Sequence, residues 1–256
     1  MTAVHRRNGG RGAATCLLMV HRVVDRVDRA VRDHDTGSES FFRLVEELQA
    51  SGRPFTTDPS PDPGSGASIA LTFDDGTADH MAVAEALAGR AIRAIFFVSA
   101  ALVGEPGYLD EAGVTRLSEL GHRVGSHGLR HARLDQLAAA DIDRELVESR
   151  SRLEDLTAAG VDLYAPVGGA GVPGLPARLQ QAGYVASRSA RWGIHTNPDE
   201  RWAMPCLPVT ELTLRRGWVT DAAATMRLST RLAVLHAVKD ALPGGIRTRV
   251  RHALSR

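Results

Sequence analysis

The sequence has only one lysine, Lys239, and the other Lys/Arg positions, 31 in total with Lys239, are all arginine. A phosphate-binding loop of the Gly-x-x-x-x-Gly-Lys type needs a lysine after its second glycine, and none is present. The sequence therefore excludes a P-loop nucleotide hydrolase. An enzyme that forms a Schiff base would have to use Lys239, which lies on a polar helical stretch near the end of the chain.

Cysteine and long apolar runs are also scarce. Cys16 and Cys206 are the only two cysteines and form no Cys-x-x-Cys pair, so we expect reduced thiols and no disulfide framework. The apolar run 16–20 has five residues, which is too short for a signal peptide or for a membrane span of about 20 residues. We therefore expect a cytoplasmic protein without an ordinary export signal or a transmembrane segment.

Length and composition favour one compact unit. The chain has 256 residues and 43% hydrophobic residues, which suits a single α/β barrel better than two small domains. The net charge of +1 and the pI near 8.0 give no reason to expect a nucleic-acid partner.

Charge is uneven along the chain, and this suggests its division. Residues 215–256 contain nine basic residues against two acids. We predict a disordered tail over 1–14, a catalytic domain over 15–215 and a basic helical segment over 216–256. That segment has no Trp or Phe on its apolar face, so we expect it to pack on the barrel, with weak membrane-surface contact as the alternative.

Two adjacent carboxylates form the centre of the pattern. The apolar run 68–73 predicts a buried strand that stops at Asp74, Asp75 and Gly76, and a helical stretch over 77–88 follows. The acids then lie at the C-terminal end of a parallel strand, where α/β folds place their chemistry. Because neighbouring carboxylates repel each other, a metal ion or a general-base role is the expected reason for the pair.

The other predicted elements alternate in type, which indicates a parallel barrel or sheet. We predict that 22–36 and 59–66 are loops. The spacing of apolar residues, and the glycines that end helices, predict the remaining strands and helices. Strands are predicted at 16–20, 94–98, 122–127, 162–167, 184–187 and 206–209, and helices at 38–51 (capped by Ser38), 114–120, 134–159, 175–182 and 222–242.

Two histidines provide a second candidate for chemistry. His127 and His131 are four residues apart and follow a predicted strand. This is a metal-ligand spacing, and one carboxylate would complete a site with three protein ligands and an open position. The alternative is a pair of ordinary surface histidines, since the chain has ten histidines in all.

Several stretches, taken together and in order, resemble the polysaccharide deacetylase family (the NodB homology domain, carbohydrate esterase 4). Residues 72–76, Thr-Phe-Asp-Asp-Gly, match its first motif, and 125–131, Gly-Ser-His-Gly-Leu-Arg-His, resemble its second. The stretches 94–98 and 18–23 are also similar to family sequences. The resemblance covers roughly residues 17–209.

The resemblance implies a distorted (β/α) barrel with an incomplete strand count and hydrolysis of an N-acetyl group on an amino sugar. It also implies one divalent metal ion, with zinc as the default and cobalt, nickel or iron as alternatives. Asp75, His127 and His131 would hold the metal. Asp74 would be the general base that accepts a proton from an activated water, although an N-cap or turn role is the alternative for this residue.

The chain departs from the family at two places. Gly128 stands where the family usually has Ser or Thr. The third family motif, Arg-Pro-Pro-Tyr-Gly, corresponds here to 164–168, Tyr-Ala-Pro-Val-Gly, so the arginine that would orient Asp74 is missing. Pro166 and Val167 would still line the substrate pocket, with the Val167 N–H as an oxyanion donor. Because this arginine is missing, an alternative to the deacetylase function stays open: a degenerate domain of this family that binds a sugar or a partner without catalysis.

The general acid is not fixed by the sequence. The family's last motif ends in Leu-x-His, and 232–236 could supply it, but the leucine spacing favours a helix there. On that interpretation His236 is an ordinary histidine. His21, at the end of the first strand, and His195 are the other candidates, and we expect His21 to form part of the pocket wall.

A glycine-rich stretch offers a competing function. Residues 169–174 read Gly-Ala-Gly-Val-Pro-Gly, which fits the GxGxxG pattern of dinucleotide-binding oxidoreductases. However, Pro173 removes an N–H from the loop, and no acid ends the next predicted strand. We therefore expect these glycines to form the rim of a sugar pocket. The expected substrate is a small molecule or glycan that carries an acetamido sugar.

Overall fold

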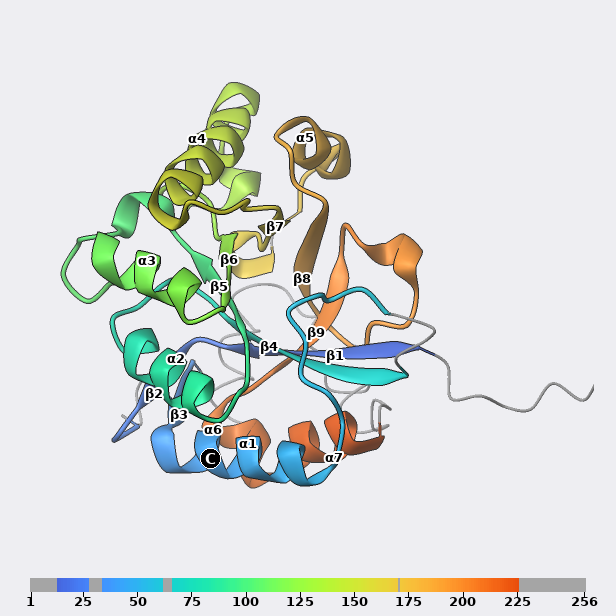
Figure 1. The fold of residues 1–256 in the computed structure, drawn as a ribbon. Helices are drawn as coiled ribbons and strands as arrows, with labels where there is room; N and C mark the ends of the chain where they lie inside the picture. The colour runs from blue at the N-terminus through green and yellow to red at the C-terminus, as the bar shows by residue number, and fades with distance from the viewer. Residues whose placement is uncertain (1–12, 28–33, 62–65, 170, 226–256) are drawn as a thin grey trace, which may run out of the picture.

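The computed structural model describes residues 13–27, 34–61, 66–169 and 171–225. Seven parallel strands close into a barrel, in agreement with the predicted (β/α) barrel (Figure 1). Around the barrel the order is also the chain order: β1 (Ala14–Val20), β4 (Ala67–Phe73), β5 (Ile95–Val98), β6 (Arg123–Ser126), β7 (Leu163–Tyr164), β8 (Ala186–Trp192) and β9 (Met204–Pro208).

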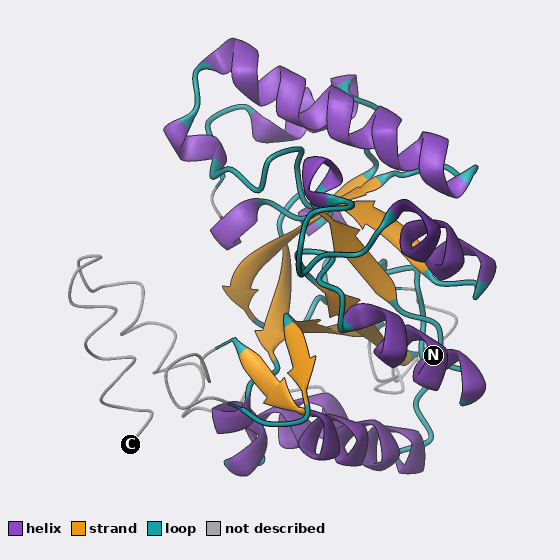
Figure 2. Ribbon diagram, turned by 90° about the vertical axis from the view of Figure 1, so that its left-hand side faces the viewer, coloured by secondary structure: helices purple, strands orange, loops and turns teal. Residues whose placement is uncertain are grey.

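Helices surround the barrel on its outside (Figure 2). The α-helices are α1 (Ser38–Ala50), α2 (His80–Gly89), α3 (Glu111–Glu119), α4 (Ala139–Thr157), α5 (Leu175–Gln181), α6 (Glu211–Arg215) and α7 (Trp218–Thr225). Short 3₁₀ turns lie at η1 (Ala100–Leu102), η2 (Leu134–Gln136), η3 (Val167–Gly169) and η4 (Pro198–Glu200). Among the described residues, no helix combines the length and apolar character needed to cross a membrane.

Alternation of side chains along the strands produces two apolar clusters. One fills the barrel and includes Leu17, Phe97 and Cys206, and the other lies between the strands and the helices and includes Cys16 and Leu18. Neighbouring residues of a strand point to opposite faces, so consecutive residues of β1 belong to different clusters. Cys16 and Cys206 therefore face different compartments, and neither forms a disulfide, as predicted.

The stretch 22–36 is not simply a loop. Arg22–Val24 (β2) pairs with Asp35–Gly37 (β3) in a two-stranded parallel sheet, which corrects the sequence prediction. Arg22 lies opposite Asp35, with an Arg22 Nη1 to Asp35 Oδ1 distance of 3.8 Å. The many charged residues of this stretch suggested a loop, but two of them, Arg22 and Asp35, pair across the two short strands.

Several predicted helix boundaries are wrong. Gly37, and not Ser38, is the N-cap of α1, and the Ser38 hydroxyl donates to the Asp25 carboxylate instead. The helix predicted over 134–159 is divided into η2 and α4, because Leu137 and Ala138 have extended backbones. The helix after the acids begins at His80, since Thr77 forms a β-bridge with Tyr108.

The C-terminal prediction is only partly covered by the described residues. The last helix begins at Trp218 and not near 222, and the Thr220 hydroxyl donates to the Glu47 carboxylate on α1. The predicted helix beyond 225, including His236 and Lys239, lies outside the described residues, as does most of the tail predicted over 1–14. The domain boundaries at 14 and 215 stay predictions.

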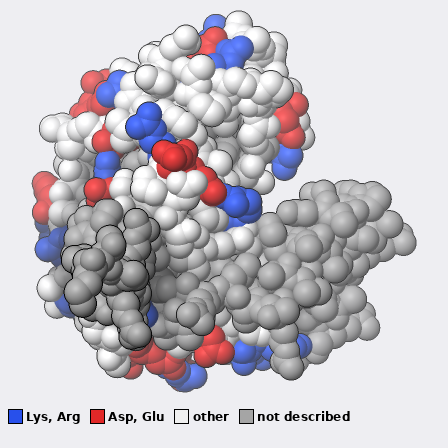
Figure 3. Space-filling model, turned by 90° about the vertical axis from the view of Figure 1, so that its right-hand side faces the viewer, with Lys and Arg blue, Asp and Glu red and all other residues white. Residues whose placement is uncertain are grey.

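Charged side chains are mixed on the face that Figure 3 draws, where blue and red groups lie next to each other. Ion pairs between exposed side chains are found among the described residues, for example Arg43 with Glu39 and Arg191 with Glu200. Exposed pairs of this kind contribute little to stability.

Candidate metal centre and adjacent carboxylate

The C-terminal ends of four strands, β1, β4, β6 and β7, place the candidate residues on one rim of the barrel. Asp74 follows β4, His127 follows β6, Pro166 lies just beyond β7 and His21 follows β1. Backbone hydrogen bonds fix the first two, from Asp74 N to Val20 O at 2.9 Å and from His127 N to Val98 O at 2.9 Å. The chemistry-bearing residues thus lie at the barrel end that the strand pattern predicts.

Asp75, His127 and His131 converge as a candidate set of metal ligands. Their ligand atoms all lie within 4.8 Å of one another. His131 Nε2 lies 2.9 Å from Asp75 Oδ1, and His127 Nε2 lies 3.3 Å from the same oxygen. The structure therefore brings together the three residues that the sequence predicted as ligands.

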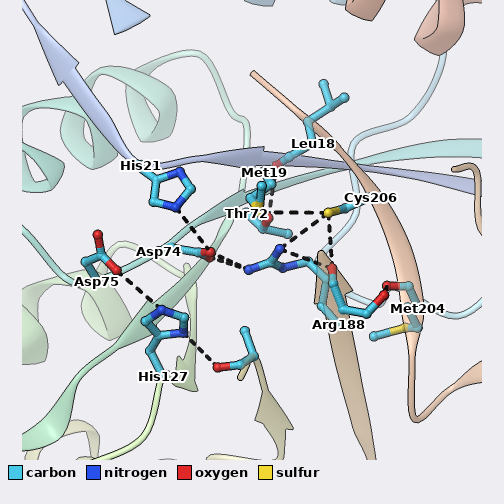
Figure 4. A network of polar contacts seen from close by, with 12 residues as sticks. Leu18, Met19, His21, Thr72, Asp74, Asp75, His127, Arg188, Met204 and Cys206 are labelled. Carbon is cyan, nitrogen blue, oxygen red and sulfur yellow. Dashed lines mark hydrogen bonds and ion pairs between the residues drawn. The ribbon is translucent and has the colours of Figure 1, made fainter. Parts of the chain in front are cut away.

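The tautomer of His127 fits metal binding. Its Nδ1 lies 2.7 Å from the Ala165 carbonyl oxygen, which can only accept a hydrogen bond, so Nδ1 carries the proton (Figure 4). Nε2 is then the ring atom that faces Asp75: in the neutral ring its lone pair can bind a metal ion, and in the charged ring its proton is donated to Asp75. An N–H to carbonyl bond behind a ligating imidazole is the usual support for a metal-bound histidine. Two imidazoles and one carboxylate are the donor set of a catalytic zinc-type site.

Electrostatics hold the carboxylate of this cluster ionised. Burial by itself raises the pKa of Asp75, but hydrogen bonds with His127 and His131 outweigh burial and hold this pKa well below its usual range. The same hydrogen bond with Asp75 raises the pKa of His131. Protons therefore compete with a metal ion for this site as the pH falls.

Two of the three candidate ligands have an unusual backbone. Asp75 has φ 81° and His131 has φ 55°, a region that residues with side chains rarely adopt. Gly76 must also lack a side chain, because a Cβ there would lie 2.9 Å from Val98 Cγ1. Such conformations persist only where the surroundings hold them, and they are concentrated at functional sites.

Asp74 has a different partner from Asp75. Nη2 of Arg188 donates to both of its carboxylate oxygens, at 2.6 Å and 2.5 Å, and both side chains are almost fully buried (Figure 4). Burial raises the pKa of Asp74, but the charges of Arg188, His127 and His21 outweigh burial and lower it. Asp74 is thus an ionised carboxylate beside the candidate ligands.

Arg188 corrects the expectation that no arginine orients Asp74. The arginine comes from β8 instead of the third motif, and its guanidinium also donates to Cys206 Sγ and lies over the Phe97 ring. We predicted a strand ending at Ser187, whereas β8 extends to Trp192. The available signal was alternation: Arg188 is two residues after Ala186, which faces the barrel interior.

The histidines proposed as general acids lie in different places. Nε2 of His21 is 4.0 Å from Asp74 Oδ2, so His21 does form a wall of the site, and burial lowers its pKa. His195 is wrong as a candidate. Its backbone pairs with Thr15 near the start of β1, at the opposite end of the barrel from Asp74.

The third-motif stretch and the glycine-rich loop lie beyond β7. Pro166 O accepts a hydrogen bond from Gly169 N, and Val167 is buried, while the oxyanion role of its N–H stays a prediction. A Cβ at Gly169 would lie 2.4 Å from Ala190 Cβ, so this glycine permits close packing against β8. The closed barrel is not the open doubly wound sheet that a dinucleotide fingerprint requires.

Comparisons with known proteins agree with this architecture. A family model described as polysaccharide deacetylase matches residues 62–187. No curated protein sequence matches the chain.

Solved structures resemble the chain in fold. A Streptococcus pyogenes deacetylase in complex with acetate has a TM-score of 0.72 and 15% identity, over 78% of this chain and 94% of that one. A Bacillus cereus polysaccharide deacetylase has a TM-score of 0.72 and 20% identity, over 83% and 69% of the two chains. IcaB from Ammonifex degensii has a TM-score of 0.70 and 20% identity, over 84% and 98%.

Proposed function

Because this chain belongs to the polysaccharide deacetylase family and is a deacetylase-type hydrolase, we propose that it removes an acetyl group from the nitrogen of an amino sugar or sugar conjugate in a metal-dependent reaction. One observation carries the proposal. A buried, ionised carboxylate, Asp74, is held by Arg188 next to the cluster of Asp75, His127 and His131.

Each residue has a proposed role. Asp75, His127 and His131 would hold one divalent ion, with zinc as the default and cobalt, nickel or iron compatible with the same donors. When bound, such an ion supplies a Lewis acid that makes a water more acidic and polarises an amide carbonyl. Asp74 accepts the proton of the attacking water, and Arg188 keeps Asp74 oriented and unprotonated for that step.

The remaining rim residues complete the pocket. The Val167 N–H would donate to the oxygen of the acetyl carbonyl as negative charge develops on it, and His21 and Pro166 would enclose the acetamido group. The bond between the carbonyl carbon and nitrogen then breaks as the nitrogen receives the proton that Asp74 took from water, which releases acetate and a free amine. A substrate found in the cytoplasm, such as a glycosylated small molecule or a lipid-linked sugar, is part of the proposal.

The alternative of a non-catalytic binding domain has weaker support. A domain that only binds has no need for a buried carboxylate beside three converging ligands, because burying such charges is costly unless they are paired. The arginine whose apparent loss suggested degeneration is replaced by Arg188.

The proposal is tested by elemental analysis of the purified chain and of a His127→Ala, His131→Ala double variant. We expect about one divalent ion per chain in the wild type and none in the variant, since three ligands define the site. We also expect the wild type, but not the variant, to release acetate from N-acetylglucosamine oligomers. A wild type that binds no zinc or cobalt after incubation with either ion would overturn the metal-dependent function.

A further inference from the structure

A buried carboxylate on α4 contacts the segment that joins the two candidate histidine ligands. Glu145 is fully buried, and its Oε2 accepts hydrogen bonds from Leu129 N at 2.7 Å and Arg130 N at 3.0 Å. Its Oε1 accepts a third, from Arg130 Nε at 2.7 Å. Leu129 and Arg130 lie between His127 and His131 in the chain, so this carboxylate binds the backbone of the ligand loop directly.

Three other backbone groups of this loop have partners outside α4. Ala100 N and Ala101 N, both in η1, donate to Gly128 O at 3.0 Å and to Leu129 O at 2.7 Å. The Ser126 hydroxyl accepts from Gly128 N at 3.1 Å. Helix α4 and the turn η1 thus both bind the backbone of the loop, and Glu145 provides the hydrogen bonds from α4.

Three features indicate that holding this loop is the role of Glu145. First, the carboxylate has no solvent exposure, and a buried charge is tolerated only when it is hydrogen-bonded or paired. Second, within the described part of the chain, each hydrogen bond that the Glu145 carboxylate accepts comes from Leu129 or Arg130, and the Arg130 guanidinium also forms an ion pair with it. Third, the loop ends at His131, whose left-handed backbone needs neighbouring contacts to persist.

We propose that Glu145 is a positioning residue for the metal centre: by fixing the backbone between His127 and His131, it keeps both Nε2 atoms directed at Asp75. The proposal rests on the proposed function, because it concerns a metal bound by these three residues. It adds a residue that lies outside every motif singled out in the sequence.

Cobalt binding tests this role without any substrate. We would titrate the metal-free protein with Co²⁺ and follow the visible absorption of the bound ion, for the wild type, Glu145→Gln and Glu145→Ala. Loss of a residue that supports metal ligands typically weakens metal affinity by about 10–100-fold. We expect Glu145→Ala to weaken cobalt binding by an amount near the upper end of this range. Glu145→Gln should weaken it by an amount near the lower end, because the amide oxygen of glutamine can still accept the backbone hydrogen bonds.

Glu148 offers a matched control on the same helix. Its side chain is 57% exposed, and its carboxylate lies 3.5 Å from Arg144 Nε. Glu148→Gln should leave the cobalt dissociation constant unchanged. Urea unfolding of each metal-free variant separates positioning from stability, because a residue that only stabilises the fold would lower the unfolding midpoint and leave the dissociation constant as it was.

The outcomes are distinct. Weaker cobalt binding in both Glu145 variants, with the Glu148 control unaffected, supports the positioning role. Wild-type affinity in Glu145→Gln and Glu145→Ala would overturn it while leaving the proposed function intact. If Glu145→Ala does not fold, the isosteric Glu145→Gln variant decides. A wild type that binds no cobalt would overturn both this inference and the metal-dependent function.

Discussion

Asp74 and Asp75 are neighbours in the chain, yet their surroundings assign them different chemistry. Asp74 turns toward the guanidinium of Arg188, and Asp75 turns toward the imidazoles of His127 and His131. Burial raises the pKa of both carboxyls, and different partners outweigh burial in each case. In the proposed function, the proton acceptor is thus separated from the metal ligand.

The Asp74–Arg188 pair leads to a prediction about stability and pH. In Arg188→Met, the buried Asp74 carboxylate loses its partner, which we expect to cost about 3–5 kcal/mol in the free energy of unfolding. The pKa of Asp74 should rise, because burial then acts with less opposition. The acidic limb of the pH dependence of kcat/KM should therefore move to higher pH. Urea unfolding and pH–rate profiles measure the two effects.

The sign of the linkage can be checked in the same variant. Because the folded-state pKa of Asp74 is lowered, its contribution to stability is present above the ordinary aspartate pKa and is lost as the pH falls through the folded-state value. In Arg188→Met, the free energy of unfolding should therefore no longer contain this contribution from the lowered pKa of Asp74. Arg152→Met, an exposed arginine on α4, is the control. Wild-type stability and an unshifted acidic limb in Arg188→Met would contradict the assigned pairing.

Sequence patterns predicted the ligand residues but not this arginine. Asp75, His127 and His131 are close to strand ends that apolar runs and glycine stops make visible. Arg188 and Glu145 act through contacts 114 and 16 residues away in the chain, and no local pattern encodes such distances. The candidate ligands were thus predictable from local sequence, whereas Arg188, which holds Asp74, and Glu145, which holds the ligand loop, were identified only from three-dimensional contacts.

At the scale of elements, the loop between β6 and η2 depends on a glycine. Gly128 has φ +84°, and a Cβ there would lie 3.3 Å from Glu145 Oε2 and 3.6 Å from the Tyr164 hydroxyl oxygen. The side chain that the family pattern would add therefore meets little open space. The left-handed backbone is the stronger obstacle, because it costs a residue with a side chain about 1–2 kcal/mol.

We accordingly expect Gly128→Ser to lower the free energy of unfolding by about 1–2 kcal/mol, in spite of matching the family residue. Gly89→Ala is the control, since Gly89 ends α2 with a negative φ and no atom within 4 Å of the added carbon. Thermal or urea unfolding compares the two. A Gly128→Ser variant as stable as the wild type would mean that the loop adopts another backbone.

Element boundaries were predicted less well than element order. Every barrel strand was expected, but β8 begins and ends later than its apolar residues suggested, since its second half carries arginines, serine and alanine. The sheet of β2 and β3 was missed because its strands have three residues each and are rich in charge. Periodicity cannot identify strands so short, and pairing across the gap depends on tertiary contacts.

At the scale of the whole molecule, barrel closure makes the site. Strand β1 pairs with both β4 and β9, so residues from both ends of the described chain lie on one rim. His21, Asp74 and Arg188 come from β1, β4 and β8 and meet only because the barrel closes. The alternation of strands and helices predicted this architecture. Which side chains meet at the rim depends on how neighbouring strands are aligned in the closed barrel.

The proposed function gives two adjacent carboxylates different roles, with Asp74 as the general base and Asp75 as a metal ligand. One paired measurement tests this assignment most directly. Metal content and acetate release from N-acetylglucosamine oligomers would be measured for Asp74→Asn and Asp75→Asn. We predict that Asp74→Asn keeps about one divalent ion per chain while its rate falls by about 10²–10⁴, the usual contribution of a general base. Asp75→Asn should lose the ion and the activity together. Metal lost from Asp74→Asn but retained by Asp75→Asn, or full activity in Asp74→Asn, would contradict the account.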